Sequence, residues 1–236
     1  MKTHIIIQAR MGSTRLPQKV MKKIQDKIVL QHDYDRLKRC QEADDVIFCT
    51  STLEEDDIIS NYCAQNGIKC FRGSQQNVLE RYYQTALICQ SDIIVRVTSD
   101  CPLVDPHYID HLIRTFKNKK EKYIGPKYFG NHMFPDGFNG EVFTFDVLKE
   151  AYFNAKEQQE KEHVTPYIIK KYSQYQHKYL LKRIYNIELD KLHLSLDTQK
   201  DFELISTIFA TLYPNNPNFT LDDVLEFLEN NPSLLK

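Results

Sequence analysis

The sequence predicts an α/β protein with a mostly parallel central sheet, on three observations. Short apolar runs alternate with amphipathic stretches through the first half of the chain, as in strands joined by crossover helices. A cation-rich loop follows the first apolar run, and α/β folds bind ligands at the carboxyl ends of parallel strands. The length of 236 residues suits a single domain, 1–236, that buries a core without disulfides.

The first half of the chain predicts strands and helices in alternation. Strands are expected at 5–7, 46–49, 68–71 and 93–97, and helices at 54–65, 78–89 and 106–116. Asn66-Gly67 should end the first helix as a C-cap does, and Pro106 should begin the third. The charged run from Lys117 to Lys122 is expected to be a solvated helix end and loop rather than a binding patch.

In the second half the helical period is lost between about 122 and 140, where glycine and proline punctuate an irregular excursion from the sheet. A strand is expected next, with Asp146 capping the helix that follows it. Further strands and helices are expected at 141–145, 147–155, 165–172, 180–187, 193–196, 199–212 and 221–229.

Composition excludes several classes of protein. The 31 basic and 32 acidic residues give a net charge of −1, which removes the basic field of a nucleic-acid binder. No apolar run reaches the roughly 18 residues of a membrane span, so a cytoplasmic protein is expected. Six cysteines without a C-x-x-C pair or a neighbouring histidine predict reduced, mostly buried thiols rather than disulfides or a zinc site.

The loop Gln8–Lys19 carries the strongest chemical signal. Arg10, Arg15 and Lys19 supply cations, Ser13 and Thr14 add hydroxyl donors, and Gly12 lets backbone N–H groups approach an anion. The spacing is not that of a P-loop. These residues favour a phosphate-binding loop, with an ordinary basic turn as the alternative.

The whole segment QARMGSTRLPQK resembles the signature of the sugar cytidylyltransferases, most closely their spore coat polysaccharide branch (SpsF type), relatives of the acylneuraminate and Kdo cytidylyltransferases. Glycine is usual where this chain has Gln18. The resemblance implies a Rossmann-like, three-layer nucleotidyltransferase fold in which this loop wraps the triphosphate of CTP. Arg10, Arg15 and Lys19 would neutralise the phosphates, and backbone near Ala9 would define the base pocket.

Three further motifs extend the resemblance to the nucleotide and metal sites. The block FRGS…NVLERYY implies that Arg72, Gly73 and Asn77 flank the nucleotide, although Asn77 would serve equally as a helix N-cap. RVTSDCPLVDP implies that Asp100, at the end of a strand, holds Mg²⁺. LSLDTQKD implies a second metal carboxylate in Asp197, with a helix cap as the alternative. Asp105, before a proline, is expected to be a cap.

The blocks GFNGEVF and EKEHVTPY also match the family. The resemblance places polar residues of these blocks on the acceptor side of the cleft: Asn139, Glu141, Glu162 and His163. The alternative to acceptor binding for His163 is a structural role. Asn139 stands where aspartate is usual, which keeps the hydrogen bonding and loses the charge.

The resemblance implies Mg²⁺-dependent transfer of CMP from CTP to a sugar, sugar acid or related small-molecule acceptor, with release of pyrophosphate, for surface polysaccharide or glycan synthesis. No general base stands out in the sequence. A nucleotide-sugar-dependent glycosyltransferase is disfavoured, because its donor has no leaving triphosphate for three cations. A catalytically altered nucleotide-binding homologue is supported only by Gln18, Asn77 and Asn139. By analogy with the family, a homodimer through about 122–140 is expected.

Overall fold

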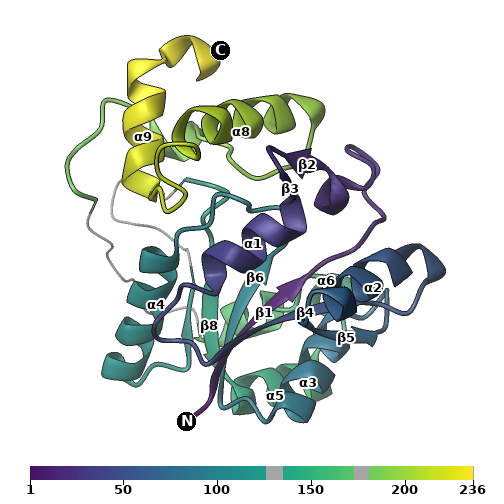
Figure 1. The fold of residues 1–236 in the computed structure, drawn as a ribbon. Coiled ribbons are helices and arrows are strands. Elements are labelled where there is room, and N and C mark those ends of the chain that lie inside the picture. Colours follow the sequence, from purple (N-terminus) through teal and green to yellow (C-terminus); the bar gives the residue numbers. More distant parts are fainter. Residues whose placement is uncertain (126–134, 173–180, 236) are drawn as a thin grey trace.

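The computed structural model describes residues 1–125, 135–172 and 181–235, and its strands form a six-stranded sheet and a hairpin (Figure 1). The strands are β1 (Thr3–Gln8), β2 (Lys23–Ile24), β3 (Lys27–Ile28), β4 (Asp45–Ser51), β5 (Lys69–Gly73), β6 (Ile93–Thr98), β7 (Tyr123–Ile124) and β8 (Glu141–Thr144). The sheet order is β5-β4-β1-β6-β8-β7, and β2 pairs with β3. β1, β4, β5 and β6 are parallel, whereas β8 runs antiparallel to β6 and β7. The predicted mostly parallel α/β class is therefore confirmed.

Helices cover both faces of the sheet. They are α1 (Val29–Leu37), α2 (Asp57–Gln65), α3 (Val78–Cys89), α4 (Pro106–Lys119), α5 (Phe145–Asn154), α6 (Gln158–His163), α7 (Pro166–Tyr172), α8 (Gln199–Leu212) and α9 (Leu221–Asn230). Short 3₁₀ turns are η1 (Lys19–Met21), η2 (Glu54–Asp56), η3 (Leu189–Lys191) and η4 (Pro232–Leu235). Within the described ranges, no helix is both long and apolar enough to cross a membrane.

The alternation of side chains along β1 divides the core into two layers. Ile5 and Ile7 pack into the cluster that contains α1, α2 and α4, whereas Ile6 packs into the cluster of α3, α5 and α7. A third cluster joins α8 and α9 to the start of α1 and to Leu103. Asp105 links these parts, since one carboxylate oxygen caps α4 at His107 N (2.8 Å) and the other accepts from Leu221 N (2.6 Å).

Most of the predicted elements are found, and two strands are not. Residues 181–187 form no strand, because carboxylates of α9 rather than a neighbouring strand satisfy their N–H groups: Lys182 N donates to Asp222 and Asn186 N to Glu229. At 193–196 there is only an isolated bridge between His193 and Asp136. The Asp146 cap is also wrong, since Thr144 accepts the bond from Val147 N at the start of α5.

The predicted excursion at 122–140 begins differently from expectation, because Tyr123–Ile124 is the edge strand β7. Residues 126–134 lie outside the described part of the chain, so dimerisation through this segment stays a prediction. The six cysteines, all within the described residues, are free thiols as expected, four of them buried.

Candidate active site

A cavity of about 570 Å³ opens at the carboxyl ends of β1 and β6. Much of the predicted site meets there, from four separate segments of the chain. The lining includes these predicted residues: Ala9, Arg10, Gly12, Ser13, Arg15, Lys19, Asp100, Glu162, His163 and Asp197. The parallel sheet accounts for this convergence, since the loops after β1 and β6 leave adjacent strands at the same edge.

The loop after β1 is held by the connection between β4 and α2. Ala9 N donates to the carbonyl of Cys49 (3.1 Å), and Met11 N donates to Asp56 Oδ1 (2.6 Å). At Gly12 a β-carbon would stand 3.1 Å from a carboxylate oxygen of Glu55, so a side chain there would push against the same connection. The loop thus has fixed anchors while Arg10 and Arg15 remain exposed to the cavity.

Gln18 ends this loop with φ 57° and ψ 27°, in the left-handed region where glycine costs least. The family's usual glycine at this position therefore has a backbone reason. Gln18→Gly is expected to raise the free energy of unfolding by roughly 0.5–1 kcal/mol, since relief of the left-handed strain exceeds the entropy that glycine adds to the unfolded chain.

Urea unfolding of Gln18→Gly against wild type measures this gain. Gln84→Gly, inside α3, is the matched control and should destabilise by about 1 kcal/mol. A loss of stability in Gln18→Gly similar to that of the control would contradict the strain argument.

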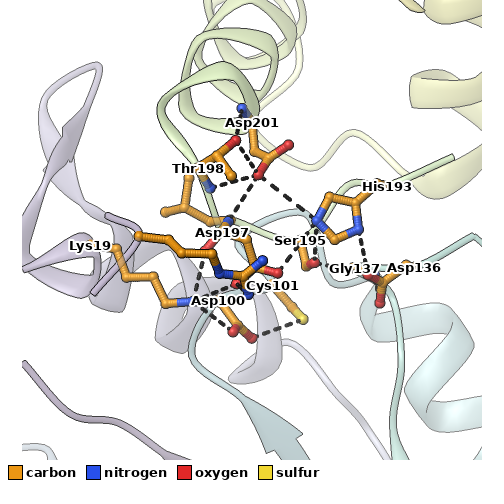
Figure 2. Close-up of polar contacts among 12 residues, drawn as sticks. Lys19, Asp100, Cys101, Asp136, Gly137, His193, Ser195, Asp197, Thr198 and Asp201 are labelled. Atoms are coloured by element: carbon orange, nitrogen blue, oxygen red, sulfur yellow. Dashed lines mark hydrogen bonds and ion pairs between the residues drawn. The ribbon is translucent and has the colours of Figure 1, made fainter. Parts of the chain in front are cut away.

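Lys19 stands at the centre of the charged part of the site (Figure 2). Its ammonium Nζ lies 2.9 Å from Asp100 Oδ2, 3.1 Å from Asp197 Oδ1 and 2.8 Å from the carbonyl oxygen of Leu196. Only 14% of the Lys19 side chain is exposed. The backbone brings the two carboxylates together, because Leu196 N donates to the carbonyl of Asp100 (2.7 Å).

The charges of this cluster stabilise one another. Burial disfavours ionisation of Asp100, but the Lys19 ammonium outweighs it and lowers the pKa of Asp100. Burial likewise opposes the charge on Lys19, while Asp100 and Asp197 raise its pKa overall. Arg15 Nη2 also reaches Asp197 Oδ1 at 3.1 Å. At neutral pH the site therefore holds Asp100 as a carboxylate and Lys19 as an ammonium.

The donor set between Asp100 and Asp197 fits a hard divalent cation. Two carboxylate oxygens and one carbonyl oxygen converge on a single position, and Mg²⁺ prefers oxygen ligands. Across the described ranges, no three His, Cys, Asp or Glu side chains are grouped to hold a metal ion. A cation here would thus need oxygens from a substrate, such as phosphates.

Asp33, on α1, adds a buried carboxyl group near this cluster. The residue is fully buried, and neither carboxylate oxygen has a hydrogen-bond partner in the described structure. Burial raises the pKa of Asp33 well above its ordinary value, and the charge of Asp100 raises it further, against weaker opposition from Arg36 and Lys19.

Several predicted site residues lie elsewhere. Arg72 donates to the carbonyls of Ser51 and Leu53 and pairs with Asp57, so it braces the β4–α2 connection and does not line the cavity. Gly73 ends β5, also outside the lining. Asn77 caps α3 by accepting from Glu80 N (3.0 Å), which supports the capping alternative.

The predicted acceptor residues divide in the same way. Glu141 is buried against Arg96, its ion-pair partner, and accepts from the Tyr123 hydroxyl at 2.7 Å, so it acts within the sheet and does not line the cavity. Asn139 Nδ2 donates to Asp136 at 3.1 Å, also outside the lining. Only Glu162 and His163 reach the cavity, from the end of α6.

The structure adds residues that sequence reasoning missed. The cavity is also lined by Gln8, Val20, Val78, Arg81, Thr98 and Ser99, and by Thr14, which the sequence had already indicated as a hydroxyl donor. Val78 and Arg81 are three residues apart at the start of α3, a spacing that puts them on one helix face and that the sequence already contained. Asp197 does not cap α8, because Thr198 and Asp201 form that capping box.

A second polar group borders Asp197, also unforeseen from the sequence (Figure 2). His193 lies between two carboxylates, with Nδ1 2.9 Å from Asp136 Oδ2 and Nε2 3.4 Å from Asp197 Oδ2. Ser195 Oγ lies 2.9 Å from Asp136 Oδ2. These side chains come from segments without regular strand or helix structure, and so without a period in the sequence.

Comparison with known proteins agrees with this fold. The cytidylyltransferase family model matches residues 4–228. An uncharacterized protein of Methanocaldococcus jannaschii is 36% identical over 99% of this chain and 93% of its own. The spore coat polysaccharide biosynthesis protein SpsF of Bacillus subtilis is 31% identical over 96% of this chain and 94% of its own. The solved structure of a cytidylyltransferase from Leptospira borgpetersenii is 30% identical, with a TM-score of 0.89, over 100% of this chain and 97% of that one.

The architecture is thus that of the nucleotidyltransferases, with a cation-rich loop and acidic side chains at the carboxyl edge of a mostly parallel sheet. The chain belongs to the cytidylyltransferase family.

Proposed function

We propose that the protein transfers CMP from CTP to the hydroxyl of a sugar, sugar acid or related acceptor. The observation that carries this proposal is the meeting of Arg10, Arg15 and Lys19 with the carboxylates of Asp100 and Asp197 in one cavity. Three cations suit a triphosphate that leaves as pyrophosphate, and two carboxylates suit a divalent cation that accompanies it.

In this reaction the acceptor hydroxyl oxygen attacks the α-phosphorus, forming a new P–O bond, and the hydroxyl proton passes to solvent. The bond between the α-phosphorus and the bridging oxygen breaks, and pyrophosphate carries away the electron pair. Arg10, Arg15 and Lys19 hold the β- and γ-phosphates and stabilise the charge that develops on the leaving group. Asp100 and Asp197 would hold Mg²⁺, which when bound neutralises phosphate charge.

Other residues of the cavity lining suit the nucleoside and the acceptor. Ala9, Val78 and Arg81 line it from the first loop and from α3, with apolar and donor groups for a base. Glu162 and His163 supply polar groups for acceptor hydroxyls. A role in polysaccharide or glycan synthesis is supported by the name of the SpsF relative.

Pyrophosphate release tests the proposal directly. The protein is mixed with Mg²⁺, one of CTP, UTP, ATP or GTP, and a panel of sugars, sugar acids and sugar phosphates, and pyrophosphate is measured with a coupled enzyme. We expect release that requires CTP and one class of acceptor. Transfer of sugar from a nucleotide-sugar donor without pyrophosphate would contradict the proposal and favour a glycosyltransferase.

Calorimetric binding of CTP with Mg²⁺ provides a test that needs no acceptor. Lys19→Ala should weaken binding by about tenfold or more, because one buried ammonium is lost from the phosphate subsite. Lys23→Ala removes an exposed ammonium nearby in the sequence and is the matched control. Absence of CTP binding by the wild type would overturn the nucleotide assignment.

A further inference from the structure

The Lys19 ammonium occupies the position between Asp100 and Asp197 where a divalent cation would bind. Its three contacts, all to oxygen, lie between 2.8 and 3.1 Å. The Lys19 side chain is 14% exposed, and the carboxylate side chains are 26% and 19% exposed. A largely buried cation with three oxygen partners is therefore a fixed part of this site, unlike an exposed surface ion pair.

Lysine and metal ion exclude one another at this position. Mg²⁺ binds oxygen at about 2.0–2.1 Å, so it would take the same oxygens that now surround Nζ and would lie too close to the ammonium. The repulsion between two cations is strong in a partly buried site. The lysine ammonium must therefore leave these oxygens before a divalent cation can bind to them.

The place of Lys19 in the fold allows that movement. It begins the one-turn helix η1, directly after the left-handed residue Gln18, and its ammonium ends a flexible four-carbon stem. The loop that it closes carries Arg10 and Arg15 on the same cavity wall. A triphosphate bound to those arginines would offer the ammonium new anionic partners and so draw it from the carboxylates.

We propose that Lys19 keeps the metal position filled in the nucleotide-free protein and yields it when a nucleoside triphosphate arrives. The divalent cation then binds well only together with the nucleotide, and the two ligands strengthen each other's binding. This inference rests on the proposed function for the identity of the nucleotide. The competition between lysine and metal does not depend on it.

Mn²⁺ titration followed by electron paramagnetic resonance tests the competition without nucleotide or catalysis. We expect weak binding by the wild type and binding about tenfold tighter or more by Lys19→Met, which keeps the length of the stem and removes the charge. Lys19→Gln provides a second uncharged side chain, with folding of each variant checked by circular dichroism. Lys23→Met, the matched control, should bind Mn²⁺ as the wild type does.

Two outcomes would overturn the inference. One is equal Mn²⁺ affinity in wild type, Lys19→Met and Lys19→Gln. The other is a gain in Lys19→Met that survives the further change Asp100→Asn, because the added ion would then lie elsewhere.

Repeating the Mn²⁺ titrations in the presence of CTP separates this inference from the proposed function. CTP should tighten Mn²⁺ binding by the wild type at least about tenfold, and by Lys19→Met much less. If Lys19→Met gains affinity while CTP changes nothing in the wild type, the competition is supported and the CTP assignment fails.

Discussion

Asp100→Asn is expected to lower the rate of pyrophosphate release by roughly 10²–10³-fold, the usual cost of removing one electrostatic contact to a transition state. Asp100 lies in the loop that follows β6. The substitution removes one of the two carboxylates around the cation position. Lys19→Ala should cost a similar factor, because the leaving pyrophosphate loses an ammonium. Both losses concern charge, so both variants should fold.

Steady-state pyrophosphate release at saturating CTP measures the loss, and circular dichroism checks the fold. Asp146→Asn serves as the matched control, since Asp146 is exposed on the first turn of α5 and does not line the cavity. It should turn over as the wild type does. Wild-type turnover in Asp100→Asn or Lys19→Ala would refute the assigned chemistry.

Asp33→Asn is expected to stabilise the protein at neutral pH, because burial raises the pKa of the Asp33 carboxyl group and its ionisation in the unfolded chain then opposes folding. The carboxyl group of Asp33 is fully buried without a hydrogen-bond partner in the described structure, and its folded-state pKa is raised. Below the ordinary pKa of about 3.9, both folded and unfolded states hold the proton. As pH rises above that value the unfolded chain ionises first, so wild-type stability is lost until the folded-state pKa is reached.

Urea unfolding between pH 3.5 and 7.5 measures this effect. The wild type and Asp33→Asn should diverge as pH rises and converge at the acid end. Asp35→Asn on the same helix removes the partner of Lys27 (2.6 Å) and should give no such gain. A constant difference between Asp33→Asn and wild type across this range would show that the charge of Asp33 is not the cause.

Buried polar residues, Asp33 among them, explain why the sequence did not predict α1. His32, Asp33 and Arg36 are all buried in α1, so three polar side chains interrupt the apolar stripe that identifies a helix. The central strands posed no such problem. β1, β4 and β6 are covered on both faces and therefore appear as continuous apolar runs.

Site residues that directly follow the strands could be predicted from the sequence. Site residues that only tertiary packing brings to the cavity could not. Arg15, Lys19 and Asp100 belong to loops whose position a parallel sheet fixes. Glu141 was misplaced, because a strand residue can face the cavity or a neighbouring strand, and the partner Arg96 decides which. His193 was missed because Asp136 and Asp197 reach it from distant irregular segments.

The pair of Lys19 and Asp197 joins residues 178 positions apart. On a ribosome the phosphate loop emerges early, whereas its second carboxylate partner is added only after most of the chain has been made. A nascent chain that has not reached Asp197 therefore cannot complete the cation site. A chain cleaved between Lys19 and Asp197 cannot complete it either once its two pieces separate. Occupancy of the site thus reports that synthesis has passed residue 197 and that the segment around it has reached its native position.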